Sequence, residues 1–266
     1  MHHALLILCG TLLLTVTAKA AIKTEVIDYK VGDVDCRGYL AYDDQAGKRP
    51  GVLVAPEWWG LTDYARHRAE MLAGLGYVAF AMDPFGDGKT TDDPQEAGKL
   101  AGALKSDIPE LRRRATAALD VLAKQPMVDP DKLAAIGYCF GGTTVLELAR
   151  SGAPILGVVS FHGGLATPNP KDAANIKGKV LICHGGDDKF ESPEEIAEFQ
   201  QSMRDANVDW QMIIYGGAVH AFTNPDADRH HISGIAYNAN ADHRSWQAMQ
   251  NFFHEIFDEP ADSGKK

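Results

Sequence analysis

Three side chains that could carry out nucleophilic catalysis occur in the order Cys139, Asp188 and His220, each shortly after a predicted strand. Cys139 lies in Gly-Tyr-Cys-Phe-Gly, a G-x-C-x-G form of a strand–turn–helix motif that usually holds a serine nucleophile. A thiol attacks as its thiolate and needs a base, and an imidazole base needs a carboxylate on its other nitrogen. The pattern predicts acyl transfer with His220 as base and Asp188 as the acid that orients it.

The carboxylates near this set have more than one interpretation. The acid loop reads HGGDD, and we favour Asp188 over Asp187 because the H-G-x-x-D spacing ends on it. Glu57 follows another strand and is either a salt-bridged loop carboxylate or a second proton carrier beside the thiol; we expect an active-site position. Trp58 and Trp59 come next and are expected to wall a pocket for an unsaturated or aromatic substrate.

The elements that must position these residues alternate between strands and helices. An antiparallel hairpin is predicted over 23–31 and 36–44, followed by continuous apolar strands separated by segments of helical periodicity. This alternation is typical of a mostly parallel sheet covered on both faces, with functional residues at the carboxyl ends of the strands. We therefore predict one α/β domain over 21–266. The other expected strands are 50–57, 76–84, 132–138, 155–163, 179–185 and 208–216, and the expected helices are 62–76, 107–125, 141–151, 193–206 and 240–257.

The amino end predicts export. Residues 4–16 form an apolar run that is shorter than the roughly 20 residues needed to span a bilayer. Ala18-Lys19-Ala20 follows as an A-x-A cleavage pattern, so residues 1–20 are interpreted as a signal peptide. An uncleaved anchor is the alternative. The mature protein is expected to begin at Ala21 and to be periplasmic or secreted.

Charge and residue spacing disfavour several classes of function. The formal net charge is −10, and it becomes −11 without residues 1–20, which contain one lysine and no acid. Such an acidic surface disfavours binding to nucleic acid or, after signal cleavage, to a membrane. No histidine pair has the spacing of a helical zinc motif, so neither a metal nor another cofactor is expected. The expected partner is a small-molecule ester or lactone, and the oligomeric state stays open.

Three cysteines lie beyond residue 20, namely Cys36, Cys139 and Cys183. An odd number implies at least one free thiol. Cys36 and Cys183 both lie in predicted strands and are interpreted as buried apolar thiols, with a disulfide between them as the alternative.

Four motifs in this order resemble the dienelactone hydrolase (carboxymethylenebutenolidase) family, and the resemblance extends from about residue 25 to residue 257. It implies an α/β-hydrolase fold without a large lid and a Cys-Asp-His triad that cleaves a small ester or lactone through a thioester. It also implies an oxyanion hole made by the backbone N–H groups of Trp58 and Phe140, and it implies that Glu57 helps to deprotonate the thiol when substrate binds. The motifs are LVAPEWWGLTDY around Glu57, GYCFGG around Cys139, HGGDDKFESP around Asp188 and GAVHAF around His220.

Two positions depart from the family pattern. Members that open dienelactone bind its carboxylate with arginines, one of them four residues beyond the catalytic histidine, and here that residue is Asn224. The other arginine would lie in the loop after the 76–84 strand, where Lys89 is the one cation. Asn224 and Lys89 are both expected to line the substrate pocket. We therefore expect neutral esters or lactones to be better substrates than carboxylate-bearing ones.

Functions other than hydrolysis remain as alternatives. Cys139 could be a redox-sensitive thiol, or the fold could bind a small ligand without cleaving it, although a complete acid and base set is more than a sensor requires. An exported thiol peptidase is disfavoured because the residue order and the fold differ from those of papain-like enzymes.

Overall fold

The computed structural model describes residues 21–44 and 47–258. The expected signal peptide, residues 1–20, lies outside the described residues. Within them, no helix combines the length and the apolar character needed to cross a membrane.

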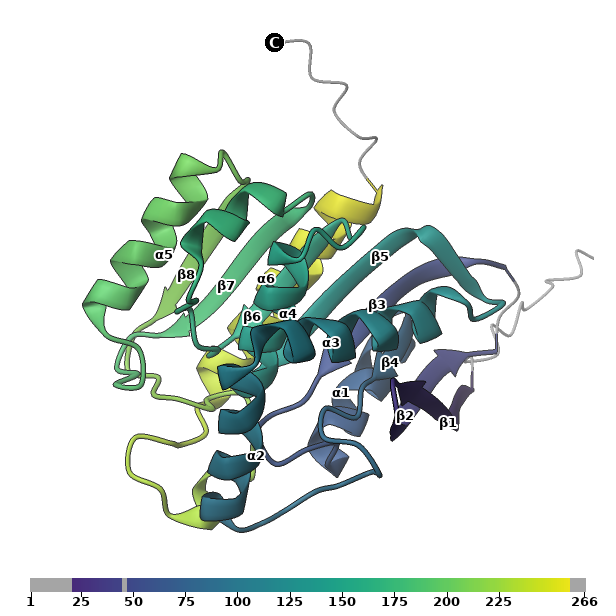
Figure 1. The fold of residues 1–266 in the computed structure, drawn as a ribbon, viewed down its shortest axis with the longest axis horizontal. Helices are drawn as coiled ribbons and strands as arrows, with labels where there is room; N and C mark the ends of the chain where they lie inside the picture. Colours follow the sequence, from purple (N-terminus) through teal and green to yellow (C-terminus); the bar gives the residue numbers. More distant parts are fainter. Residues whose placement is uncertain (1–20, 45–46, 259–266) are drawn as a thin grey trace, which may run out of the picture.

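The described residues contain one eight-stranded sheet, in the order β1-β2-β4-β3-β5-β6-β7-β8 (Figure 1). β1 pairs with β2 and β2 with β4 in antiparallel fashion, whereas the remaining neighbours are parallel. The predicted α/β-hydrolase fold, with a mostly parallel sheet and an N-terminal antiparallel hairpin, is confirmed. The strands are β1 (Ile22–Val31), β2 (Val34–Asp43), β3 (Arg49–Ala55), β4 (Val78–Ala81), β5 (Val128–Tyr138), β6 (Gly157–Phe161), β7 (Lys179–Gly185) and β8 (Trp210–Tyr215).

Helices cover both faces of the sheet (Figure 1). α3, α4 and α5 pack on one face, and α1 and α6 pack on the other. α5 begins with a capping box between Ser192 and Glu195, which satisfies N–H groups that the first helical turn leaves free. The helices are α1 (Asp63–Gly74), α2 (Pro94–Ser106), α3 (Ile108–Ala123), α4 (Phe140–Arg150), α5 (Pro193–Asp205) and α6 (Ala239–Asp258), with 3₁₀ turns η1 (Pro170–Asn175) and η2 (Ala227–His230).

The central strands are apolar along their whole length because both of their faces are buried. In β3, Leu53 and Ala55 contribute to the core under α3, α4 and α5, whereas Val52 and Val54 contribute to the core under α1 and α6. Successive side chains of a strand point to opposite faces, so an unbroken apolar run supplies both cores. This double cover holds the strand ends, and the residues that follow them, in fixed positions.

The sequence pattern does not predict α2. The helix carries a start signal, since Asp93 accepts a hydrogen bond from the Gln95 N–H at 2.9 Å and Pro94 occupies the first turn. Its periodicity is weak because two glycines, Gly98 and Gly102, interrupt it. Ala101 and Leu104 of α2 pack against Phe140, so the helix supports the residue that follows Cys139.

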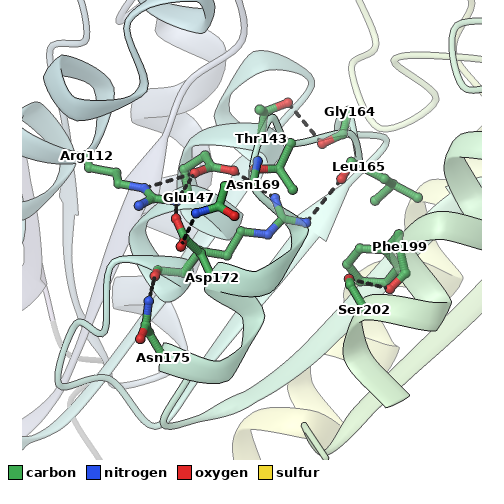
Figure 2. A network of polar contacts seen from close by, with 12 residues as sticks. Arg112, Thr143, Glu147, Gly164, Leu165, Asn169, Asp172, Asn175, Phe199 and Ser202 are labelled. Carbon is green, nitrogen blue, oxygen red and sulfur yellow. Dashed lines mark hydrogen bonds and ion pairs between the residues drawn. The ribbon is translucent and has the colours of Figure 1, made fainter. Parts of the chain in front are cut away.

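A buried ionic network holds α4 in place (Figure 2). The carboxylate of Glu147 is fully buried and accepts from Arg112 Nη2 at 2.7 Å and from Arg150 Nη1 at 2.8 Å. Arg150 Nη2 donates to the carbonyl oxygen of Leu165 at 3.1 Å, and Arg112 also pairs with Asp172 at 2.7 Å. These contacts join α4 to α3 and to the segment that follows β6. The network therefore holds the C-terminal half of α4, the helix whose first residue follows Cys139.

Candidate active site

Cys139 lies in a strained turn between β5 and α4. Its φ of 52° and ψ of −117° are costly for a residue with a Cβ, by about 1–3 kcal/mol. The flanking glycines make the turn possible. A Cβ on Gly137 would lie 2.0 Å from the carbonyl oxygen of Gly141, and a Cβ on Gly141 would lie 2.0 Å from that of Ala55. The thiol is partly exposed and contributes to the lining of a cavity.

Two backbone amides near this turn are available as donors. Phe140 is the first residue of α4, so its N–H points out of the helix at the end that carries partial positive charge. Trp58 follows Glu57 after β3 and lines the same cavity as Cys139. Among the hydrogen bonds of the described residues, neither the Trp58 N–H nor the Phe140 N–H donates to a protein acceptor.

His220 and Asp188 form a buried hydrogen bond. His220 Nδ1 lies 2.8 Å from Asp188 Oδ2, and the other oxygen of Asp188 accepts from the Phe190 N–H at 2.9 Å. Asp188 is buried, whereas Asp187 is exposed, so burial separates the two neighbours that the sequence offered. The carboxylate directs the opposite nitrogen of the His220 ring away from itself and toward the cavity that the ring lines.

The charges around His220 favour its protonated form. Burial alone lowers the pKa of this imidazole, but charge interactions and hydrogen bonds with Cys139 and Asp188 outweigh burial and raise its pKa to about 10.

The other two described cysteines have a different environment. Cys36 and Cys183 are free and buried, as the interpretation of two apolar thiols predicts, and no disulfide joins them. Burial raises the pKa of Cys36 to about 11 and that of Cys183 to about 12. Neither thiol is therefore suited to nucleophilic attack at neutral pH.

Glu57 is buried beside the cavity and is held by Asn224. Burial raises the pKa of Glu57 to about 7, and hydrogen bonding to Asn224 and the charge of His220 oppose that rise. Asn224 Nδ2 donates to Glu57 Oε2 at 2.7 Å, and Asn224 Oδ1 accepts from the Asp226 N–H at 2.9 Å. Asn224 does line the cavity, but its amide group is engaged within the protein.

The cavity has a volume of about 480 Å³ and an aromatic wall. The Trp59 ring stacks on the His230 ring with 4.0 Å between centroids and 22° between planes. Both side chains line the cavity, as does Trp58. The expectation that Trp59 walls the pocket agrees with this geometry.

Lys89 is placed differently from the sequence-based expectation. Its amino group pairs with Glu96 at 2.9 Å, and the cavity is lined by the neighbouring Gly88 and Thr90 instead. The expectation that Lys89 lines the pocket is therefore wrong, because a carboxylate on α2, the helix that the pattern does not predict, holds the side chain outside it.

Arg66 and Arg229 are cavity cations that sequence reasoning missed. Arg66 pairs with Asp63 at 3.4 Å and Arg229 pairs with Asp92, and both aspartates also line the cavity. Each arginine thus has a carboxylate partner already. Asp226 also lines the cavity and is exposed, and its carboxylate has no hydrogen-bond or ion-pair partner among the described residues.

His162 and Thr223 were also missed as parts of the site. His162 directly follows β6, and Tyr138 pairs with Phe161 in register, so Cys139 and His162 come next to each other at the strand ends. The strand-end rule that selected Cys139 applies equally to His162 and could have identified it. Thr223 lies three residues beyond His220 in the same loop. Within the described residues, no cluster of three or more histidine, cysteine or acidic side chains could hold a metal ion.

Comparisons with known proteins agree with this fold. The model of the dienelactone hydrolase family matches residues 36–257. The chain belongs to the dienelactone hydrolase family, and the protein is accordingly a hydrolase that acts on esters or lactones.

Two solved structures and one curated protein illustrate the similarity. The structure of m3DLH is 49% identical, with a TM-score of 0.87 over 89% of this chain and 99% of that one. A dienelactone hydrolase-like promiscuous phosphotriesterase from metagenomic libraries is 46% identical, with the same TM-score of 0.87 and the same coverage of 89% and 99%. Protein usf of Aquifex pyrophilus is 30% identical over 204 residues, which are 75% of this chain and 87% of that protein.

Proposed function

We propose that the protein cleaves a small carboxylic ester or lactone through a thioester on Cys139, with His220 as proton carrier and Asp188 as the carboxylate that orients it. The observation that carries the proposal is the 2.8 Å contact between His220 Nδ1 and Asp188 Oδ2 at a cavity that Cys139 and His220 both line. A carboxylate on one imidazole nitrogen leaves the other free to exchange protons with a nucleophile.

In the acylation step, the Cys139 thiolate attacks the carbonyl carbon, a C–S bond forms and the carbonyl electrons move to oxygen. The N–H groups of Trp58 and Phe140 are the proposed donors to this oxyanion. As the C–O bond to the leaving group breaks, protonated His220 donates its proton to the departing alkoxide. The acyl group remains as a thioester, and the alcohol, or the alcohol arm of an opened lactone, is released.

In the deacylation step, neutral His220 removes a proton from water as the water oxygen attacks the thioester carbonyl. The C–S bond then breaks and the carboxylic acid leaves. The sulfur departs as thiolate, and the proton stays on the imidazole, which restores the starting pair. Asp188 stabilises the charged ring at both ends of the cycle.

Where Cys139 is present as the thiol before substrate binds, Glu57 is proposed to take up its proton on binding and release it to water, which leaves the thiolate and protonated His220 that begin the acylation step. A raised pKa of about 7 suits a group that must both take up and release a proton near neutral pH. The contact of Glu57 with Asn224 supports this role, because it keeps the carboxylate at the cavity.

The decisive experiment replaces the sulfur. We expect Cys139→Ala to abolish hydrolysis of 4-nitrophenyl acetate and of small lactones, while the melting temperature stays close to that of the wild type. Cys36→Ala is the matched control, since Cys36 is a buried thiol away from the cavity, and it should retain kcat within about twofold. Full activity of Cys139→Ala would sink the proposal.

Mass spectrometry of the wild-type protein after treatment with an activated ester distinguishes hydrolysis from the alternative functions. An activated ester should acylate Cys139, visible as a mass increase, and the label should then turn over. A redox sensor would instead form a sulfenic acid or mixed disulfide under mild peroxide and show no turnover of the ester. A ligand-binding protein would show saturable binding without any covalent adduct.

A second candidate activity is hydrolysis of neutral phosphotriesters. One support is the similarity to the promiscuous phosphotriesterase, which is 46% identical. The other is that each of the two cavity arginines already has an aspartate partner, so the cavity suits an uncharged substrate. The Cys139 thiolate would attack phosphorus, form an S–P bond and expel an aryl oxide, and water activated by His220 would then break that bond.

Diethyl 4-nitrophenyl phosphate tests this second activity. Release of 4-nitrophenol beyond one equivalent, lost in Cys139→Ala, supports it. Release that stops at one equivalent means that the phosphorylated thiol is not hydrolysed, and it rejects phosphotriester turnover while leaving ester hydrolysis in place.

A further inference from the structure

A buried chain of hydrogen bonds leads from the backbone of Cys139 into the protein interior. The Cys139 N–H is shared between two acceptors, the Phe161 carbonyl oxygen at 3.0 Å and His162 Nδ1 at 3.1 Å. His162 Nε2 lies 2.7 Å from Thr223 Oγ1. Thr223 Oγ1 lies 2.6 Å from the hydroxyl of Tyr64, which accepts from Arg68 Nε at 3.2 Å. Cys139 on β5–α4 is thus connected to the loop after β8 and to α1.

The donors and acceptors in this chain have one consistent assignment. His162 Nδ1 must accept from the Cys139 N–H, so the proton of the neutral ring lies on Nε2 and is donated to Thr223. Burial lowers the pKa of His162 well below its ordinary value, which agrees with a neutral ring. The Tyr64 hydroxyl accepts from Arg68 and therefore donates its own proton to Thr223. Turning the His162 ring over would break both of its bonds.

Arg68, at the end of this series of hydrogen bonds, is itself held by several contacts. Arg68 Nη2 donates to the carbonyl oxygen of Thr223 at 2.6 Å and to Asp242 Oδ1 at 2.5 Å. Arg68 is 4% exposed, so these bonds are shielded from water. Aromatic rings also surround its guanidinium, with Tyr64 and Trp246 at 5.2 Å and Tyr138 at 5.5 Å.

We propose that His162 is a positioning residue for the Cys139 nucleophile, an inference that rests on the proposed function. Both residues have positive φ, 52° for Cys139 and 40° for His162, so each strained turn must be held by its surroundings. The hydrogen bond from the Cys139 N–H to His162 Nδ1 connects the two turns and stabilises both. Thr223 then connects this pair to the loop that carries His220.

His162 acts without touching the substrate. It is 1% exposed and is not among the described residues that line the cavity. Its ring packs edge-on against that of His220, with 5.3 Å between centroids and 64° between planes. His162 therefore contacts both the nucleophile's backbone and the base, and its removal should slow acylation more than it weakens binding.

Two substitutions of His162 each remove one of the two hydrogen bonds of its ring and keep the other. In His162→Asn, the side-chain oxygen takes the place of Nδ1 and can still accept from the Cys139 N–H, but the link to Thr223 is lost. In His162→Gln, the longer side chain can still donate to Thr223, but the side-chain acceptor for the Cys139 N–H is lost and the Phe161 carbonyl oxygen alone remains. Each variant loses one hydrogen bond of the ring, but Asn adopts a positive φ more readily than Gln, so the melting temperature should fall more in His162→Gln. Rates are therefore compared at a temperature at which both variants are fully folded.

The measurements are the burst rate of 4-nitrophenol release from 4-nitrophenyl acetate, KM, and the mass of the acyl adduct on Cys139. We expect His162→Gln to acylate about tenfold more slowly than the wild type with KM within about twofold, and His162→Asn to retain the rate within about threefold. A His162→Gln rate equal to or above that of His162→Asn overturns the inference. If wild-type protein forms no Cys139 adduct, the proposed function itself fails.

Thr223 provides a second test if the His162 variants do not fold. Thr223→Val keeps the shape but removes the oxygen that accepts from His162, whereas Thr223→Ser keeps that oxygen. Without this acceptor the His162 ring can turn over and withdraw Nδ1 from the Cys139 N–H, which the side-chain oxygen of His162→Asn does not do. Burst rates should therefore fall about tenfold in Thr223→Val and stay within about threefold of wild type in Thr223→Ser. Equal rates in the two variants would contradict a positioning role for the chain.

Discussion

Asn224 Nδ2 donates a 2.7 Å hydrogen bond to Glu57 Oε2, which joins the loop that carries His220 to the end of β3. The bond stabilises the ionised form of a buried carboxyl whose pKa is about 7, raised by burial. Removing the donor should therefore raise the pKa of Glu57 further.

Asn224→Leu tests this contact through the pH dependence of activity. Losing one bond to a charged group should raise the pKa of Glu57 by about one unit, so the acid limb of the kcat/KM profile should move to higher pH by a similar amount. Asn251→Leu, on the exposed face of α6, is the control and should leave the profile unchanged. An acid limb that does not move in Asn224→Leu would show that Glu57 ionisation does not govern activity.

Glu57 should make the folded protein less stable as the pH rises from about 4.5 to about 7. Its pKa is about 7 when folded and 4.5 ordinarily, so the folded state retains a proton that the unfolded chain has lost, and stability falls as pH rises through this window. The full cost above pH 7 is about 3 kcal/mol. In urea unfolding, Glu57→Gln should gain stability over wild type between pH 4.5 and pH 8. Glu96→Gln, at an exposed carboxyl whose pKa its bond with Lys89 lowers, should show no such gain, and a pH-independent effect of Glu57→Gln refutes the prediction.

Neutral substrates should be preferred over carboxylate-bearing ones. The cavity arginines are already paired, and the exposed Asp226 repels anions. We expect kcat/KM for a neutral aryl ester to exceed that for its carboxylate-bearing analogue at least about tenfold, which corresponds to ~1.4 kcal/mol.

Two variants should narrow this gap. Asn224→Arg adds a cation beside Glu57, and Asp226→Asn removes the unpaired carboxylate, with an effect of a few-fold that added salt weakens because the charge is exposed. Both should act on the charged substrate more than on the neutral one. A wild-type preference for the charged ester would mean that one of the arginines leaves its aspartate to bind substrate.

The Glu147 network should be essential for stability. Glu147→Gln leaves the buried Arg150 without its counter-charge, and removing one partner of a buried pair costs about 3–5 kcal/mol. Glu255→Gln breaks an exposed pair with Lys179 and should cost less than about 1 kcal/mol in the same urea titration. Similar losses in the two variants would argue against a structural role for the buried network.

We propose that the protein is exported and that its mature chain begins at Ala21. Mass spectrometry of protein isolated from the native host should show an amino terminus near this residue, in the periplasmic or culture fraction. Cytosolic protein that retains Met1 would overturn the proposal.

The sequence by itself determined the order of the elements and the residues at the strand ends. Hydrophobic periodicity is a local property, so the hairpin, the apolar strands and most helices were predictable without the fold. The glycines around Cys139 and the spacing of the acid loop are local as well, and they indicated Cys139 and Asp188. The weak periodicity of α2, interrupted by Gly98 and Gly102, left that helix unpredicted.

Only the tertiary structure decided which side chains meet. Asn224 binds Glu57, 167 residues away in the chain, and Lys89 is held by Glu96 instead of entering the cavity. His162 reaches Cys139 because β5 and β6 lie side by side in register. Such contacts depend on side-chain direction and on the packing of distant elements, which residue type and spacing do not encode locally.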